Sequence, residues 1–153
     1  MKKIDSFTVN HNCLVPGIYI SRKDGDLTTY DLRTRKPNCG IYMDNQTMHS
    51  LEHMFATYIR NSTLSDDVIY FGPMGCQTGF YLIIRNANNL RVLSVVKEVL
   101  KKILEHEGDV FGSTSIECGN YRNLELASAK AESKLFLSLL ESNPNVTFQY
   151  PNE

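Results

Sequence analysis

Two short blocks near the start of the chain, residues 17–21 and 27–33, are rich in β-branched and aromatic residues, and Lys-Asp-Gly-Asp lies between them. Blocks of this kind on either side of an Asp-Gly turn signal are typical of a β-hairpin. Further strands are predicted over residues 68–71 and 80–85, which flank a glycine-rich loop at 72–79.

Longer segments place apolar residues at intervals of three and four, the period of an α-helix with one buried face. These segments cover residues 46–59, 90–107 and 124–141. Asp44 or Asn45, at the end of a turn-rich loop, can cap the first helix, and Gly108 is suited to end the second. The side chains expected to be buried are Met48, Leu51, Phe55, Ile59, Val92, Val96, Val99, Ile103, Leu126, Ala129, Leu135 and Leu139.

The order of these elements indicates the fold class. Strands come in adjacent pairs and do not alternate one by one with helices, which favours an α+β fold with an antiparallel β-sheet packed against a few helices. The chain has 153 residues, with no internal repeat and no linker-like segment. We therefore expect a single domain over residues 1–153, in which residues 143–153 form a polar C-terminal tail.

Composition excludes several classes of function. The 16 Lys and Arg residues balance 17 Asp and Glu residues, for a net charge of -1, which argues against a basic surface for nucleic acid and against a polybasic membrane anchor. No apolar run is long enough to span a bilayer, and the first ten residues lack the apolar core of a secretory signal. We expect a cytoplasmic protein with its four cysteines reduced.

The segment His49-Ser50-Leu51-Glu52-His53 lies in the first predicted helix. Histidines at i and i+4 lie on one helix face, so both imidazoles can reach one metal ion. Glu52 lies on the same side, where its carboxylate can transfer protons without being a ligand. The H-x-x-E-H order is that of inverzincin metallopeptidases, so one interpretation of the segment is a metallopeptidase site. The other is a pair of solvated histidines beside an ordinary glutamate.

Two of the cysteines have settings that suit chemistry. Cys118 would complete a His2Cys ligand set for a borderline-soft divalent ion, whereas zinc peptidases of this class normally use a carboxylate as the third ligand. Cys76 lies in the glycine-rich loop, which can aim amide groups at a thiolate and expose it as a nucleophile or proton carrier. Either can instead be a packing residue, as we expect of Cys13 and Cys39.

Several separated motifs carry a family resemblance. They are His-Ser-Leu-Glu-His at 49–53, Pro-Met-Gly-Cys-Gln-Thr-Gly at 73–79, Glu-Cys-Gly at 117–119, Asp-Ser-Phe at 5–7, Asn-His-Asn at 10–12, Tyr-Asp-Leu-Arg at 30–33, Lys-Pro-Asn at 36–38 and Leu-Glu-Leu-Ala at 124–127. Together they resemble the S-ribosylhomocysteine lyase (LuxS) family, over about residues 4–138.

The resemblance implies an activity. Members of this family cleave the thioether of S-ribosylhomocysteine to homocysteine and 4,5-dihydroxy-2,3-pentanedione, the autoinducer-2 precursor of quorum sensing, by carbonyl migration and β-elimination. By this resemblance the ligands of one divalent metal ion per subunit are His49, His53 and Cys118, with Fe2+ as the native ion and Zn2+ or Co2+ as alternatives. Glu52 and Cys76 are then the two general acid/base residues.

The resemblance also implies partners. Similar proteins are homodimers with two active sites at the subunit interface, and their partner is the small-molecule substrate, with no nucleic acid and no membrane. Ser6, His11 and Arg33 would contact substrate, and Arg33 is suited to a bidentate pair with the homocysteine carboxylate. Without the resemblance, the same residues would be interpreted as a cap serine, a surface histidine and a strand-edge arginine.

The chain departs from the family pattern at three places. Tyr70 stands where the family usually has aspartate, Gly72 stands where it usually has serine, and residues 108–116 lack a run that is usual there. These departures leave a further alternative open, a non-catalytic metal-binding descendant of the lyase. The metallopeptidase alternative predicts amide hydrolysis with Glu52 as the base and no function for Cys76.

Overall fold

The structure is a computed structural model that describes residues 1–152. Over these residues the chain forms the strands β1 (Gly17–Asp24), β2 (Leu27–Arg33), β3 (Val68–Pro73) and β4 (Gly79–Arg85) and the helices α1 (Asn45–Arg60), α2 (Asn89–Glu105) and α3 (Leu126–Ser142). The short 3-10 helices η1 (Asp5–Phe7), η2 (Ser65–Asp67) and η3 (Tyr121–Asn123) lie in the connections.

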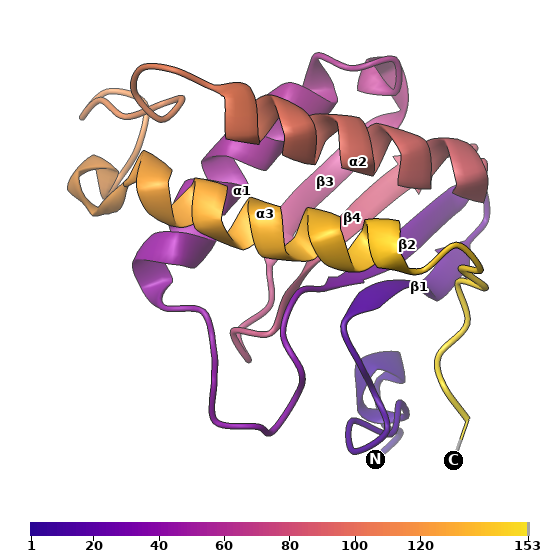
Figure 1. Ribbon diagram of the computed structural model, residues 1–153. Coiled ribbons are helices and arrows are strands. Elements are labelled where there is room, and N and C mark those ends of the chain that lie inside the picture. The colour runs from indigo at the N-terminus through magenta and orange to yellow at the C-terminus, as the bar shows by residue number, and fades with distance from the viewer. Residues whose placement is uncertain (153) are drawn as a thin grey trace.

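The strands form one antiparallel sheet in the order β1-β2-β4-β3. Helices α1, α2 and α3 all lie on one face of this sheet, so the chain forms two layers (Figure 1). The predicted α+β fold with an antiparallel sheet is therefore confirmed. In the register of β2 and β4, Arg33 pairs with Gly79, which puts the end of β2 beside the turn that carries Cys76.

The hydrophobic core fills the space between the sheet and the helices. The apolar stripes predicted on α1 and α2 are all buried in it, which explains why these segments form helices with one face against the sheet. Within residues 1–152, no helix combines the length and the apolar character that crossing a membrane requires.

Helix α3 differs from its prediction. It begins at Leu126 and not at residue 124, and Leu135, which we expected to be buried, is 60% exposed. The buried face of α3 runs instead through Ala129, Ser133, Phe136 and Leu140, which follow one another at helical spacing, and Leu135 lies well outside this stripe. Helix α2 also ends two residues early, with its C-cap at His106 and not at Gly108.

The C-terminal segment packs against the sheet despite its polar composition. Phe148 is only 6% exposed, and its carbonyl accepts a hydrogen bond of 2.8 Å from the amide of Ile20 in β1. Tyr150 stacks on Tyr19 with ring centroids 5.1 Å apart. Residues 143–152 thus form a segment that returns along the edge of the sheet (Figure 1).

Candidate metal centre and active site

Helix α1 positions the histidines. Its first turn is capped by Asp44, whose carboxylate accepts a 2.7 Å hydrogen bond from the amide of Thr47, as the sequence allows. The buried stripe of α1 fixes the helix rotation, which leaves His49, Glu52 and His53 half-buried on a neighbouring face. The rings of His49 and His53 meet edge to face with centroids 4.6 Å apart.

Cys118 completes a cluster with these histidines. Its Sγ lies 3.3 Å from Nε2 of His49, and one ligand atom from each of His49, His53 and Cys118 lies within 4.8 Å of the others. Distances of this size between ligand atoms suit one ion bound at about 2.0–2.3 Å from nitrogen and sulfur. The amide of Asn120 also points at Cys118 Sγ, at 3.4 Å, and such a donor favours the thiolate that binds metal.

Hydrogen bonds outside the cluster orient both imidazoles. His53 Nδ1 lies 2.7 Å from the carbonyl oxygen of Phe111, which can only accept, so Nδ1 carries the proton and Nε2 keeps its lone pair. His49 Nδ1 lies 3.1 Å from the side-chain oxygen of Asn123, with the same consequence. Such partners fix the tautomer of metal-binding histidines. The donor set, its spacing and its tautomers therefore fit a divalent ion.

Glu52 is the acidic neighbour of this cluster. It lies between the two histidines on α1 and is half-buried. Within the part of the chain that the structure describes, its carboxylate makes no hydrogen bond and no ion pair to another residue. A carboxylate beside a metal cluster that is not already engaged is available to accept and return a proton.

Cys76 lies in a second group of residues. It is exposed in the tight turn between β3 and β4, where Gln77 adopts a φ of +66°. The turn borders a cavity of about 430 Å³ that is also lined by Ser6, His11, Arg33 and Tyr81. The structure therefore brings Cys76 together with all three residues that we expected to contact substrate. None of His49, Glu52, His53 and Cys118 lines this cavity.

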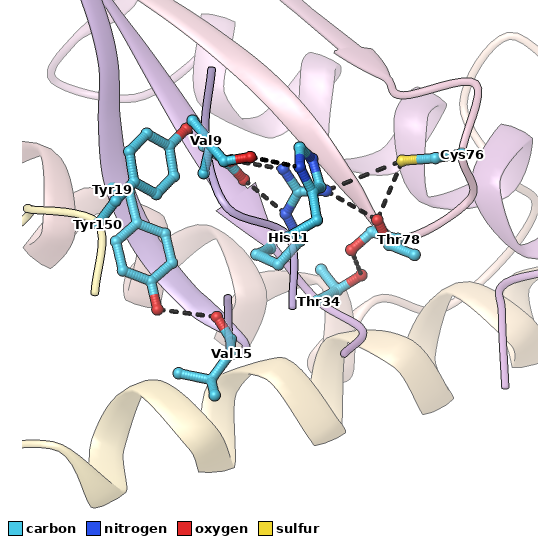
Figure 2. A network of polar contacts seen from close by, with 10 residues as sticks. Val9, His11, Val15, Tyr19, Thr34, Cys76, Thr78 and Tyr150 are labelled. Carbon is cyan, nitrogen blue, oxygen red and sulfur yellow. Dashed lines mark hydrogen bonds and ion pairs between the residues drawn. The ribbon is translucent and has the colours of Figure 1, made fainter. Parts of the chain in front are cut away.

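Arg33 is the centre of the second group, and its contacts differ from our expectation. Its Nε and Nη2 donate to the two carboxylate oxygens of Asp31, at 3.1 and 2.6 Å, and only 3% of the Arg33 side chain is exposed. The edge of the guanidinium formed by Nε and Nη2, which we expected to bind the carboxylate of the substrate, is thus already paired with Asp31. Nη1 instead donates to Thr78 Oγ1 at 2.8 Å and lies 3.8 Å from Cys76 Sγ (Figure 2).

Cys76 lies beside a fixed positive charge. Burial acts to lower the pKa of Arg33, but the charge and hydrogen bonds of Asp31 outweigh burial and raise that pKa, so the guanidinium stays charged. A fixed cation next to a sulfur stabilises the anionic form of the sulfur. Thr78 Oγ1 adds a polar contact at 3.0 Å. The described partners of Sγ are thus side chains, and not the loop amides that we expected.

The remaining expected residues have simpler surroundings. Ser6 lies in η1 and is half-buried. His11 is half-buried as well, and its Nδ1 lies 2.9 Å from the carbonyl oxygen of Val9, to which it donates. Cys13 and Cys39, which we interpreted as structural, are free thiols, as are Cys76 and Cys118.

Sequence reasoning missed the residues that support the site. Asp31 is two residues from Arg33 on one strand and therefore on the same face, a spacing that signals an ion pair. The supporting contacts come from Phe111, in the connection between α2 and α3, and from Asn123, at the end of η3, and no local sequence pattern predicts them.

Comparison with known proteins decides the family. The family model for S-Ribosylhomocysteinase (LuxS) matches residues 4–146. The chain belongs to the LuxS family. It is 42% identical over 156 residues to the S-ribosylhomocysteine lyase of Finegoldia magna, with 99% of each chain covered. It is 42% identical to that of Clostridium beijerinckii, with 99% of this chain and 100% of the relative covered, and 39% identical to that of Desulfotalea psychrophila, with the same coverage.

Membership of the LuxS family is consistent with the metal-ligand cluster of His49, His53 and Cys118 and with the cavity beside Cys76. It confirms the resemblance that the separated motifs indicated, and it does not favour a metallopeptidase or a non-catalytic descendant. The curated relatives are named as lyases of S-ribosylhomocysteine, which makes the family one of carbon–sulfur lyases.

Proposed function

We propose that this protein is an S-ribosylhomocysteine lyase that releases homocysteine and 4,5-dihydroxy-2,3-pentanedione. The observation that carries the proposal is the pairing of Cys76 with the buried cation Arg33, 3.8 Å away, in a chain that also has a His2Cys cluster. Hydrolysis of amides needs a metal and one base and leaves Cys76 without a function, whereas carbonyl migration needs two proton carriers.

The types of ligand in the cluster decide which metal ions it can bind. We propose that His49, His53 and Cys118 hold Fe2+ in the native protein, with Zn2+ or Co2+ as alternatives, because two imidazoles and a thiolate suit these ions. The bound ion would act as a Lewis acid that stabilises negative charge on the oxygens of the substrate.

Glu52 and Cys76 move the protons. Each carbonyl shift removes a proton from the carbon next to a carbonyl group and returns a proton at the neighbouring position. In the last step a proton leaves the carbon next to the carbonyl, its electron pair forms a carbon–carbon double bond, and the bond to sulfur breaks. Homocysteine then leaves as a thiolate and takes up a proton. Glu52, on α1, serves one side of the bound sugar, and the Cys76 thiolate serves the other.

Arg33 acts in this scheme through Cys76. The guanidinium edge that does not bind Asp31 contacts Thr78 and the sulfur, so a positive charge lies beside the thiol that acts as a base. Ser6 and His11, which line the same cavity, are positioned to hydrogen-bond the hydroxyl groups of the substrate.

We also propose that the active unit is a homodimer of single-domain subunits in the cytoplasm, with active sites at the interface. The face of the sheet opposite the helices supports this. It carries a cavity of about 380 Å³ whose lining combines the apolar and aromatic side chains of Ile4, Tyr70, Tyr81 and Ile83 with polar and charged residues, and a second copy would cover the apolar ones. Sedimentation should give twice the 17.4 kDa of one chain, and a fully active monomer would refute the dimer.

Thiol release tests the proposed activity. The protein, loaded with Fe2+ or Co2+ under reducing-agent-free anaerobic conditions, is incubated with S-ribosylhomocysteine, and free thiol is titrated over time. The same preparation is incubated with an unstructured peptide. We expect one thiol per substrate consumed and no new amino termini from the peptide. Peptide hydrolysis without thiol release would establish the metallopeptidase, and bound metal with neither reaction would establish the non-catalytic descendant.

A further inference from the structure

We propose that Tyr150, in the C-terminal segment, is a positioning residue for the reactive thiol. Its hydroxyl holds Asp31, and Asp31 holds the Arg33 guanidinium beside Cys76. The inference deepens the proposed function and rests on it for the assignment of Cys76 as a proton carrier. Nothing in the sequence around Tyr150 marks it as part of a site, because the segment from residue 143 is polar and contains no motif.

A continuous chain of hydrogen bonds joins Tyr150 to the active-site group. The Tyr150 hydroxyl donates to Asp31 Oδ2 at 2.8 Å, and Arg33 Nη2 donates to the same oxygen at 2.6 Å. Arg33 then reaches Thr78 and Cys76 through Nη1. Figure 2 shows Tyr150 and Tyr19 on one side of this network and Cys76 and Thr78 on the other. The two central members are almost completely buried, with 1% of Asp31 and 3% of Arg33 exposed.

Burial explains why the third donor matters. A carboxylate removed from water needs hydrogen bonds to its lone pairs, and Arg33 alone supplies one bond to each oxygen of Asp31. The Tyr150 hydroxyl supplies another and so takes up part of the negative charge. Without it, Asp31 would neutralise more of the guanidinium charge and draw the group toward itself. Less of the positive charge of Arg33 would then act on Cys76.

Tyr150 is well suited to remain a donor. Burial, followed by the charge of Asp31, raises the pKa of Tyr150, so its hydroxyl keeps its proton at neutral pH and can only donate to the carboxylate. A hydrogen bond with Ser21 opposes this shift without reversing it.

The ring of Tyr150 is held independently of its hydroxyl. It stacks on Tyr19 with an interplanar angle of 23°, and the buried Phe148 fastens the segment to β1. Removing the hydroxyl oxygen alone should therefore leave the ring in place. Tyr19 supplies a matched control, because its hydroxyl donates to the carbonyl of Val15 at 2.8 Å and makes no hydrogen bond to Asp31 in the described chain.

The other titratable and charged groups around Cys76 and Asp31 stay constant in this comparison. Those that face Cys76 are Arg33 from β2, His11 from the N-terminal segment and Tyr81 from β4. Those that face Asp31 are Arg33, Tyr19, Tyr81 and Tyr150. Tyr150→Phe changes one member of the second set and none of the first, so a change in Cys76 reactivity must pass through Asp31 and Arg33.

Site-resolved alkylation tests the inference. The metal-loaded full chain and its Tyr150→Phe and Tyr19→Phe variants are treated with iodoacetamide between pH 5 and 9, and labelling of each cysteine is quantified by peptide mass spectrometry. For Tyr150→Phe we expect labelling of Cys76 near pH 7 to slow by about three- to tenfold and its pH midpoint to rise, which corresponds to a loss of half to one pH unit of thiolate stabilisation. Labelling of the exposed Cys39 should not change, and Tyr19→Phe should behave as the unmodified protein.

Each other outcome overturns the inference. Equal Cys76 rates and midpoints in Tyr150→Phe and the unmodified protein would show that the hydroxyl does not act on the thiol. An equal slowing in Tyr19→Phe would assign the effect to packing. The labelling needs no turnover, so its result is separate from the lyase assay: a chain that fails to release thiol but shows the labelling contrast refutes the proposed function and leaves the link from Tyr150 to Cys76 in place.

Discussion

The phenol of Tyr70 lies over Gly72, in the space that a Cβ at position 72 would occupy. These are two of the positions at which the chain departs from the usual pattern of the LuxS family, where aspartate and serine stand. The two departures are thus coupled physically, because the larger side chain at position 70 requires the absence of one at position 72. Gly72 itself lies in β3, so its lack of a side chain is needed for this close approach.

A double-mutant cycle tests that coupling. Gly72→Ser alone forces Tyr70 to move, and we expect it to lower the free energy of unfolding by about 1–2 kcal/mol, the range for overpacking. With Tyr70→Asp in place, Gly72→Ser should cost less, which gives a coupling energy of about 1 kcal/mol. Urea denaturation of the four proteins measures it, with Gly75→Ala as a control because a Cβ there meets no atom within 4 Å. Additive effects would exclude the coupling.

Gly112 is expected to control metal affinity. It adopts a φ of +69°, and a Cβ on it would lie 3.1 Å from Nδ1 of His53, the atom that donates to the adjacent Phe111 carbonyl. Gly112→Ala should rotate this imidazole and weaken divalent metal binding by about tenfold, the lower end of the effect of lost supporting bonds. Competition with a chelator measures the affinity.

Gly108 provides the control for that variant. It has a φ of +98°, but a Cβ there would meet nothing within 4 Å. Gly108→Ala should therefore lower stability through backbone strain and leave metal affinity unchanged. If both variants lose the same affinity, strain in the loop is responsible and the contact with His53 is not.

Thr78 is expected to stabilise the buried Arg33. Only 3% of Thr78 is exposed, and its hydroxyl accepts from Arg33 Nη1. Thr78→Val leaves this buried donor without its best acceptor and should lower the free energy of unfolding by about 1–3 kcal/mol. Thr78→Ser keeps an oxygen there and should recover most of the loss in the same urea titration. A loss in Thr78→Ser without a loss in Thr78→Val would mean that the methyl group, and not the hydroxyl, carries the effect.

The cap of α1 predicts a pH dependence of stability. Hydrogen bonding to Thr47, first through its side chain and then through its backbone, lowers the pKa of Asp44 in the folded protein. Because the folded pKa is the lower one, the stabilisation is present above the unfolded value of about 4 and is lost as the pH falls through the folded value. Asp44→Ala should cost about 1 kcal/mol at pH 7.

Asp44→Asn separates charge from capping. The amide oxygen can still accept from Thr47, so this variant should keep most of the stability at pH 7 and should lose less than the unmodified protein on acidification. Chemical denaturation at pH 7 and pH 3 measures both differences. An Asp44→Ala deficit that stays constant down to pH 3 would contradict the assignment of the cap to the ionised carboxylate.

Local spacing explains which parts of the fold were predictable. The apolar stripes of α1 and α2 give both the helices and their buried faces, because helical geometry converts a spacing of three and four into one surface. In α3 the leucines do not mark the buried face, because Leu135 is 60% exposed. The buried face of α3 includes Ala129 and Ser133, whose small side chains let the helices approach closely. A prediction based on the leucines alone therefore wrongly expected Leu135 to be buried.

The same limit applies to the site. His49 and His53 are one helical turn apart, so their meeting follows from the sequence alone. The contact of Cys118 with His49 spans 69 residues, and ligand chemistry offered it only as one interpretation until the family motifs were considered. Tyr150 reaches Asp31 across 119 residues, in a segment without a recognisable pattern, and only the folded chain reveals that contact.

The measurement that tests the central claim most directly compares the unmodified protein with Cys76→Ala, each assayed for bound metal and for thiol released from S-ribosylhomocysteine. Cys76 is separate from the cluster of His49, His53 and Cys118, so the variant should bind the same amount of metal as the unmodified protein. We predict that thiol release falls by at least about a hundredfold, the contribution of one positioned proton carrier. Undiminished thiol release by Cys76→Ala with its full complement of metal would contradict the account.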